Sequence, residues 1–478
     1  MAVNTKDIIE IVNDSANVDR INEDKDRFLV YQGQLKRIVR RAMEREFKKE
    51  ETIRELSHRL VPINIVQKIV DKLSTVYLNK PIRSSIDKNP QDDELIELYE
   101  SAFKSDLRGR SANRYFKLHK HTATEFYIDK MGIPRKRVMP SQTYTPISMN
   151  STDPESADIF VKHIKFSSER DKQIHHVWTD EEFKIIDGKG NIINSLMMRM
   201  DNPKGVNPFG VIPQSHIKEA DDGLILPISD DDLISIQIVI SALLTDLTFA
   251  SKYQLWSIYV LKGIKKRLEV FLNPNAILQL PEGVDLDTIK PDVDVDKSLM
   301  LIETLIGMLL TTKNLSVGDI TGSLSVQNAS SGIAKMIDRS ETTEDRQDQE
   351  SIFEDAEKEE WRKFSKNILP VWTKGRQLNN EYSNSFSDNF DLSIKFTTSK
   401  PTISDSEKVK TEKEKVEAGF TTRRRSIKEL NPHMEDGEVD DLIGEIKKEK
   451  EQNAIDAKQS IQKAGMSEEE DGEDGSES

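Results

Sequence analysis

The chain has 478 residues, more than one hydrophobic core normally serves, so we expect two or more structural units. Hydrophobic residues make up 36% and charged residues 32%, a balance that favours elongated, well-solvated elements whose apolar helices need neighbours. The net charge of −15 argues against a protein that clamps DNA by neutralising many phosphates, and the lack of cysteine excludes disulfides, thiol catalysis and cysteine-based zinc sites.

The N-terminal part is predicted to be helical. Residues 6–60 follow a helical pattern, with charges of both signs that are typical of a solvated face. A second helix is expected over Val61–Leu78, where apolar residues recur at a helical period, and a third over Asp92–Leu107. The first residues lack the basic start and apolar run of a secretion signal, so we expect no secretion.

A strand-rich part follows between Tyr115 and Ile193. Short runs of β-branched and aromatic residues predict strands at 126–128, 159–166, 175–178 and 183–186. Asp187–Gly190, with the sequence DGKG, is typical of a hairpin turn. We therefore expect a small antiparallel sheet.

Two apolar helices are expected next, over Asp231–Tyr253 and Leu299–Lys313, with strands at 256–261 and 276–280 between them. Carboxylates at the start of the first helix favour its dipole. Aspartates interrupt the surrounding apolar stretch, Leu224–Ala250, and would be costly in lipid. We therefore predict a buried or interface helix and no membrane partner.

The C-terminal part alternates polar loops and charged helices. Small polar residues over Lys313–Gln327 predict a loop before a long helix, Ser330–Leu369, whose middle contains no apolar residue. Such a helix is predicted to bridge two bodies through solvent or between subunits. A strand is expected over Leu392–Thr397. Charged helices at 404–417, 424–430 and 438–450 and a disordered acidic tail at 467–478 complete the chain.

No arrangement of residues in the sequence indicates an enzyme or a cofactor. None of the eight histidines has metalloprotease spacing, and the chain lacks the phosphate-binding loop of an ATP motor and the serine elbow of a hydrolase. His119 and His121 are expected to share one strand face, where a metal would need a third ligand. We predict no catalytic residues and no metal.

One acidic run imitates a calcium loop. Its residues take positions 1, 3, 5 and 12 of such a loop, but Lys297 stands at position 6, where the sharp turn needs glycine. We interpret the run as solvated carboxylates at a helix N-terminus. The residues are Asp292, Asp294, Asp296 and Glu303.

Four motifs occur in a fixed order along the chain. They are VPINIVQKIVDKLSTVYLNKPI (61–82), NPFGVIP (207–213), SSGIA (330–334), and TTRRRSIKELNPHMED with the acidic residues that follow it (421–441). None is specific alone. Together, in this order, they resemble the portal proteins of tailed bacteriophages, in particular the long-chain portals of phages of Gram-positive hosts.

The resemblance implies an α+β portal-like fold. Its parts are a wing, stem helices, a small α/β clip, a tunnel loop with a long helix, and a helical crown. The implied boundaries are 1–229 for the wing, 230–254 for the first stem helix, 255–296 for the clip, 297–313 for the second stem helix, 314–331 for the tunnel loop, 332–400 for the long helix and return strand, 401–466 for the crown and 467–478 for the tail.

The resemblance also implies a function. Such a chain forms a homo-oligomeric ring, of twelve copies, at one capsid vertex, through which double-stranded DNA is packaged and ejected. The implied partners are the terminase large subunit, the major capsid and scaffolding proteins, and the head–tail adaptor. The protein would assemble in the host cytoplasm and reside in the virion.

Two groups of candidate site residues follow from this resemblance. The DNA-channel candidates are Lys313, Asn314, Ser316, Gly318, Asp319, Thr321, Gly322 and Ser323. The clip candidates for docking the motor or adaptor are Lys262, Lys265, Lys266 and Arg267, for which a solvated basic turn is an equal alternative. A channel that lets a polyanion slide should have few phosphate contacts, which fits the acidic composition.

Two other classes of function stay open. One is a non-portal virion scaffold or adaptor, which the lack of sustained heptads disfavours. The other is a cytoplasmic enzyme with a site in the 115–193 sheet, which the lack of catalytic motifs disfavours. A strand-containing insert between the two apolar helices would favour the portal.

Overall fold

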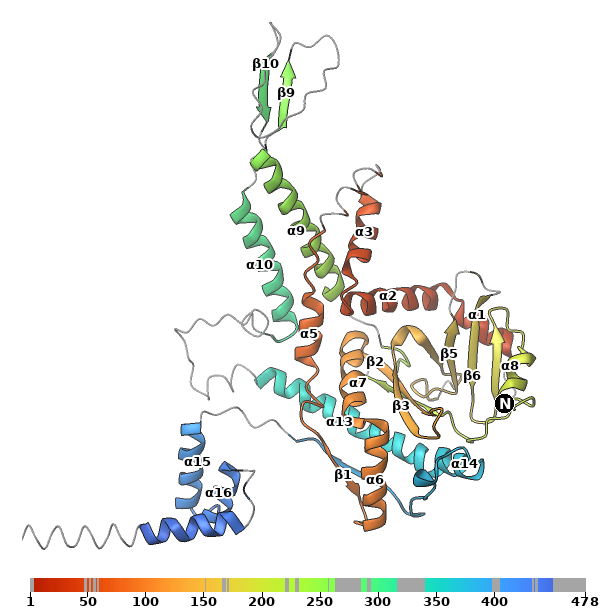
Figure 1. The fold of residues 1–478 in the computed structure, drawn as a ribbon. Coiled ribbons are helices and arrows are strands. Elements are labelled where there is room, and N and C mark those ends of the chain that lie inside the picture. Colours follow the sequence, from red (N-terminus) through yellow and green to blue (C-terminus); the bar gives the residue numbers. More distant parts are fainter. Residues whose placement is uncertain are drawn as a thin grey trace, which may run out of the picture. The chain divides into compact units, whose positions relative to one another are not determined.

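The computed structural model describes residues 4–46, 50, 53–54, 57, 60–150, 152–165, 169, 172–219, 223–227, 232–256, 258–262, 285–289, 294–315, 340–397, 405–431, 434 and 437–449. The chain divides into two units, one formed by Met1–Asn328 with Arg339–Ser399 and the other by Ala329–Asp338 with Lys400–Ser478. The fold is mixed α+β, mostly helical with small antiparallel sheets (Figure 1).

Among its described residues, the first unit opens with the helices α1 (Thr5–Val12), α2 (Ser15–Tyr31), α3 (Leu35–Glu46) and α5 (Ile65–Leu73). Asn4, Asp14 and Asn64 cap α1, α2 and α5 by accepting a backbone N–H, as expected of these residue types. Helix α5 is shorter than the helix predicted over 61–78. The chain leaves it at Ser74, and Tyr77 then enters a separate apolar cluster.

Helices α6 (Pro90–Phe103) and α7 (Ser105–His119) replace the single helix predicted over 92–107. The break is Lys104, whose φ of 53° is left-handed. This one residue ends α6 and begins α7, so the two helices meet at an elbow.

Two antiparallel sheets form the strand-rich part. The three-stranded sheet has the order β3-β2-β8, and the four-stranded sheet has the order β4-β5-β6-β7. The strands are β2 (His121–Ile128), β3 (Pro134–Met139), β4 (Tyr144–Ile147), β5 (Ile159–Lys165), β6 (Ile174–Trp178), β7 (Phe183–Asp187) and β8 (Gln214–Lys218). The four predicted strands are confirmed as β2, β5, β6 and β7. The short helices η1 (Ser141–Thr143) and α8 (Asn194–Arg199) lie between strands.

The predicted hairpin turn is confirmed after β7. The Asp187 carboxylate accepts the N–H groups of Lys189 and Asn191, and Gly190 takes a φ of 84°, which favours glycine. The chain then turns back so that Ile192 bridges Ile186.

The two apolar helices are α9 (Asp232–Trp256) and α10 (Val295–Thr312), close to the predicted spans. They pack against each other and carry β9 (Ile258–Lys262) and β10 (Asp285–Ile289) at their far end (Figure 1). The two strands pair antiparallel from Ile258↔Ile289 to Lys262↔Asp285. The second strand therefore lies at 285–289, whereas 276–280, where it was predicted, lies outside the described residues.

The long helix is described from Ser340 as α13 (Ser340–Lys363), and the predicted start at 330 lies outside the described residues. It passes into a π-helical turn, η3 (Phe364–Ile368), and then α14 (Leu369–Lys374). Pro370 lacks the N–H that a continuous α-helix would use at this point, which accounts for the change of register. After η4 (Asn380–Tyr382), β11 (Leu392–Lys395) confirms the predicted strand.

Strand β11 pairs antiparallel with β1 (Ile82–Ser85), from Ile82↔Lys395 to Ser85↔Leu392. An aromatic core lies nearby. The ring of Phe103 is 4.8 Å from that of Phe126 and 4.9 Å from that of Phe364, centre to centre. This core joins α6, β2 and the end of the long helix.

The second unit contains α15 (Asp405–Glu417), α16 (Arg423–Leu430) and a helix over 437–449, which confirm the three charged helices predicted there. Arg424 on α16 donates to Asp440 at 2.7 Å, so an arginine of the TTRRRSIKELNPHMED motif forms an ion pair with the helix over 437–449. The acidic tail at 467–478 lies outside the described residues.

Candidate assembly interface

The hairpin of α9 and α10 exposes apolar side chains to solvent. On α10, Met300 is 65% exposed, Met308 60% and Leu301 50%, and on α9 Val239 is 46% exposed. Met300 and Met308 are two helical turns apart, so they lie along one face of α10. Contiguous exposed apolar surface marks a contact site for another body.

The opposite side of the hairpin packs on the body of the first unit. Ile302, Leu309 and Leu310 of α10 and Ile240 of α9 are at most 5% exposed and share a cluster with helices α2, α3 and α5. The hairpin is thus held by one face and leaves the other uncovered.

A polar stripe fixes α9 to the start of α5. Gln237, Ser241 and Thr245 recur every four residues and are at most 1% exposed. The Gln237 side-chain oxygen accepts the N–H groups of Ile65 (2.8 Å) and Val66 (3.3 Å), and its nitrogen donates to the Ile63 carbonyl (2.7 Å). These bonds satisfy two N–H groups that the helix start leaves free. The recurrence of these three residues on one side of the helix is the sequence signal for this contact.

In the described part of the chain, one helix, over Asp232–Ser251, is long and apolar enough to cross a membrane by length and composition alone. The same helix carries the buried stripe that is hydrogen-bonded to α5. Polar side chains that bond a neighbouring segment favour packing within protein over exposure to lipid. This agrees with the prediction of a buried or interface helix.

The base of the hairpin is closed by an ion pair. Lys313 Nζ lies 3.2 Å from Asp232 Oδ1, and the lysine side chain is 15% exposed. Asn314, with a φ of 54°, turns the chain away from α10. Of the DNA-channel candidates only these two, Lys313 and Asn314, are described. The others lie outside the described residues: Ser316, Gly318, Asp319, Thr321, Gly322 and Ser323.

The clip candidates are described only in part. Lys262 is the last residue of β9, and Lys265, Lys266 and Arg267 lie outside the described residues. In the calcium-loop imitation, Asp292 is also outside. Asp294 caps α10, and Asp296 and Glu303 lie within that helix, so these carboxylates follow a helix and do not surround a loop. Among the described residues no three His, Cys, Asp or Glu side chains are grouped to hold a metal ion.

The prediction that His119 and His121 share a strand face is wrong. His119 ends α7 and His121 begins β2, because Lys120 between them takes a φ of 60°. His119 Nδ1 contacts Asp24 at 3.1 Å. His121 contacts the Ser141 hydroxyl through Nε2 (2.9 Å) and the Tyr144 hydroxyl through Nδ1 (2.7 Å).

These histidines belong to a buried polar network. Ser141 donates to Asp24, and further along His163 Nδ1 lies 2.9 Å from His175 Nδ1, so one imidazole must be neutral to accept. Burial lowers the pKa of His163 well below its usual range and that of His175 to about 4. The pKa of Asp24 is lowered: burial opposes this, but the hydrogen bond and charge of His119 prevail.

Ser141 contacts both His121 and Asp24 without forming a hydrolase triad. The Asp24 carboxylate accepts a hydrogen bond from the Ser141 hydroxyl. In a triad the carboxylate would instead accept from the imidazole that contacts the serine, here His121. Ser141 is also 0% exposed, so a substrate does not reach it. The arrangement ties α2 to the sheets and gives no support to the enzyme alternative.

Helix α13 turns one side toward the body of the first unit; within the polar stretch that was predicted to bridge through solvent, Arg346 and Gln349 are buried while Gln347 and Asp348 are exposed. Gln349, Glu357 and Glu360 are 3%, 4% and 1% exposed. Gln349 accepts from Asn113 at 2.9 Å, and Glu360 accepts from Lys136 and Thr124. Charged partners on other elements make burial possible.

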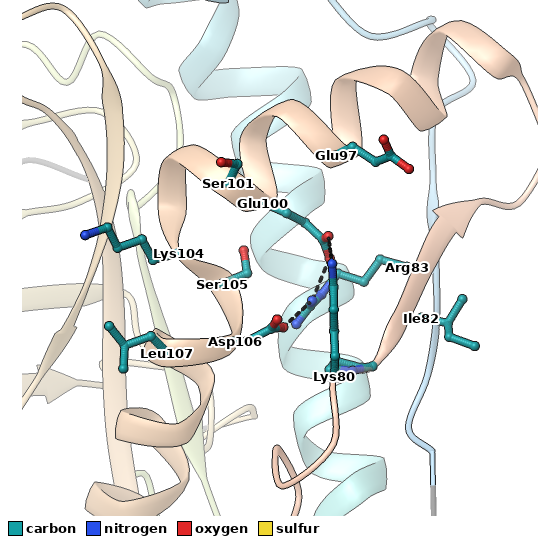
Figure 2. A pocket seen from close by; sticks show the side chains of 11 residues that line it. Lys80, Ile82, Arg83, Glu97, Glu100, Ser101, Lys104, Ser105, Asp106 and Leu107 are labelled. Atoms are coloured by element: carbon teal, nitrogen blue, oxygen red, sulfur yellow. Dashed lines mark hydrogen bonds and ion pairs between the residues drawn. The ribbon is translucent and has the colours of Figure 1, made fainter. Parts of the chain in front are cut away.

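Arg83 lines a cleft of about 780 Å³ between β1 and the α6–α7 elbow (Figure 2) and pairs with Glu357 of α13. The Arg83 side chain is 0% exposed and donates to Glu357 (2.7 Å), Glu100 (2.6 Å) and Asp106 (3.2 Å). Its donors are thus committed to carboxylates within the chain. Arg83 and these three carboxylates form an ionic joint between β1, α13, α6 and α7.

Tyr77 completes this joint by donating to Glu357 at 2.6 Å. Burial, and then the charge of Glu357, raise the pKa of Tyr77 well above its usual range, so the hydroxyl keeps its proton. The Tyr77 ring lies against Gly109, where an added Cβ would come within 2.5 Å of it. Glycine is therefore required by this close approach.

No protein-family model matches the chain, and no curated protein matches it. Among solved structures it is similar to a chain in the neck of an empty gene transfer agent particle computed with C6 symmetry, with 11% identity and a TM-score of 0.35, over 79% of this chain and 89% of that one. It is also similar to a chain of the virion of a native gene transfer agent particle, with 12% identity and a TM-score of 0.34, over 80% and 94%. At these values we draw no functional conclusion from either.

Proposed function

We propose that this protein is a portal-type subunit of a phage-like particle. Copies form a ring at one capsid vertex, which is the channel for packaging and ejecting double-stranded DNA and the docking site for the terminase and the head–tail connector. The observation that carries the proposal is the α9–α10 hairpin: one face is packed on the body, the other exposes Met300 and Met308, and a two-stranded insert joins the two helices.

Each part of this observation bears on the alternatives. A rod-like scaffold needs sustained heptads and has no use for an insert of paired strands between two apolar helices. An enzyme needs an accessible site, but Ser141, His121, His163 and His175 are at most 7% exposed. A ring subunit, by contrast, needs an apolar helix face that a lone copy cannot cover.

The proposed role is mechanical. The chain supplies no catalytic group, so the energy for DNA movement comes from the packaging motor. The segment 314–331, which begins with Asn314 directly after Lys313 at the hairpin base, is proposed to line the channel. Net charge of −15 suits a bore in which DNA slides without deep electrostatic wells.

Mass photometry and electron microscopy of the purified protein test the ring. We expect closed rings for the natural chain and monomers for the double variant Met300→Asp, Met308→Asp, because two carboxylates would be buried at the contact. The matched control is Met131→Asp with Met198→Asp, which alters equally exposed methionines (77% and 68%) away from the hairpin. Monomers of the natural chain at all micromolar concentrations and salts would contradict the proposal.

A motor-driven packaging assay tests the channel. Gly318 and Gly322 give the 314–331 segment conformations that other residues resist. Replacing both by Val should leave ring formation intact and reduce packaging. Duplex DNA should bind the ring weakly, with affinity that falls steeply as salt rises. Normal packaging by the double variant would mean that the segment lies away from the DNA.

A further inference from the structure

Helices α3 and α10 lie on two sides of α9 (Figure 1). Each contacts α9 directly, and all three contribute to one apolar cluster. The hairpin and α3 therefore form a layer of three helices with two different outer edges. The side chains on these edges differ in kind.

The α3 edge is basic. Helix α3 turns Leu35, Val39 and Met43 inward, where they are at most 4% exposed. Its exposed residues include four basic side chains and one acidic one: Lys36, Arg37, Arg40, Arg45 and Glu44. Glu44 lies 3.0 Å from Arg40, so the edge keeps an excess of positive charge on a chain that is strongly acidic overall.

The α10 edge is apolar and acidic. Met300 and Met308 are exposed along it, together with the carboxylates of Asp296 and Glu303. Its one basic residue, Lys297, lies 2.9 Å from Asp294. The edge thus pairs an apolar strip with an excess of negative charge, the complement of the α3 edge.

We propose that the α10 edge of one copy packs against the α3 edge of the next copy in the ring. This deepens the proposed function and rests on it. The aliphatic stems of Arg37 and Arg40 would cover Met300 and Met308, and their guanidinium groups would face Asp296 and Glu303. Arginine suits this contact because its stem covers apolar surface while its charged head stays at the rim.

A second copy fits these edges better than a nucleic acid does. The phosphate backbone would use the arginines of α3 but would leave the methionines of α10 uncovered. A protein edge that is both apolar and acidic matches both features at once. The apolar contact then supplies most of the affinity, while the charges fix which faces meet and in which register.

Charge reversal tests the pairing. One variant carries Arg37→Glu with Arg40→Glu, a second carries Asp296→Arg with Glu303→Arg, and a third combines all four changes. Mass photometry over a concentration series gives the concentration at which half the protein is in rings. We expect each reversal alone to raise this half-assembly concentration about tenfold or more. The combined variant should return most of the way to the natural value, since opposite charges again face each other.

The control reverses exposed charges elsewhere, with Lys172→Glu and Glu359→Arg, and should assemble like the natural chain. Circular dichroism of all variants checks that the fold is intact. If the natural chain forms rings and either reversal assembles normally, or the combination stays impaired, the pairing is wrong while the proposed function stands. If the α3 reversal assembles normally but loses DNA binding, α3 faces DNA and the pairing is wrong as well. Failure of the natural chain to form rings overturns both.

Discussion

The body around α13 and the α9–α10 hairpin place their side chains in opposite ways. In the body, the charged side chains of Arg83, Glu357 and Glu360 are at most 5% exposed. On the hairpin, Met300 and Met308 are at least 60% exposed. One region buries charge and the other exposes apolar surface.

The difference separates folding from assembly. Arg83, Glu357 and Glu360 have their partners in the same chain, so this part of the body needs no second copy to pair its charges. The exposed face of the hairpin has no such cover among the described residues. Changes in the body should therefore act on the free energy of unfolding, and changes on the exposed hairpin face should act on association.

The largest effect is expected at Arg83. Arg83→Met removes the partner of Glu357 and leaves a buried, uncompensated carboxylate, which should lower the free energy of unfolding by roughly 3–5 kcal/mol. Urea titration measures the change. Arg424→Met, which breaks an ion pair whose side chains are 52% and 58% exposed, is the control and should cost less than about 1 kcal/mol. Equal losses of stability in the two variants would show that the buried ion pairs of Arg83 stabilise the fold no more than the exposed pair of Arg424.

The second largest effect is expected from acid, which should lower the free energy of unfolding of the body. His175 is held neutral by burial, with its pKa lowered to about 4, against an opposing effect of Asp187. Below about pH 6.5 His175 binds a proton in the unfolded chain but stays neutral in the folded chain. The free energy of unfolding therefore falls as the pH drops from about 6.5 to about 4, and this contribution is fully present above about pH 6.5. At pH 5, His175 alone should lower the free energy of unfolding by about 2 kcal/mol.

Urea titrations at pH 7.5 and 5 measure that loss, and His175→Gln should reduce it. Asp24 acts in a separate window, because its lowered pKa gives stability that is present above about pH 4 and lost in stronger acid. A loss of stability at pH 5 that is unchanged in His175→Gln would exclude this histidine as a cause.

A smaller effect is expected where the hairpin meets the body. Gln237→Leu leaves the N–H groups of Ile65 and Val66 without their side-chain acceptor, at a cost of roughly 1–2 kcal/mol. Hydrogen exchange should quicken at these two amides. Ser235→Leu, an exposed change on the same helix, is the control and should leave them protected. Unchanged exchange in the Gln237 variant would mean that α9 is held by apolar packing alone.

The smallest effect is expected at the hairpin base. Lys313→Ala removes the ion pair with Asp232, which is partly exposed, so stability should change by less than about 1 kcal/mol. Because Lys313 is held by that aspartate, DNA affinity of the ring should keep the same dependence on salt. A shallower salt dependence in the variant would indicate that Lys313 contacts phosphate directly.

Much of the secondary structure could be predicted because local patterns determine it. The apolar runs of α9 and α10, the strands β5, β6 and β7, and the DGKG turn all follow from periodicity and turn chemistry. The elbow at Lys104 could not be predicted, because no glycine or proline marks it.

The buried face of α13 could not be predicted either. Its polar residues are buried only because Arg83, Lys136 and Asn113, more than 200 residues away in sequence, supply partners. A local pattern of charges cannot distinguish this from a solvated helix. Likewise His119 and His121 were separated by a single left-handed residue, which sequence alternation does not reveal.

The unlike chemistry of the α3 and α10 edges bears on how assembly stops. A contact between two different edges leaves one free edge of each kind on every growing chain of copies, so addition can continue without limit unless the rotation per copy closes the circle. A small error in that angle would give an open helical filament in place of a ring. The packing of α3 and α10 on α9, by setting the angle between the two edges, would then determine the number of subunits.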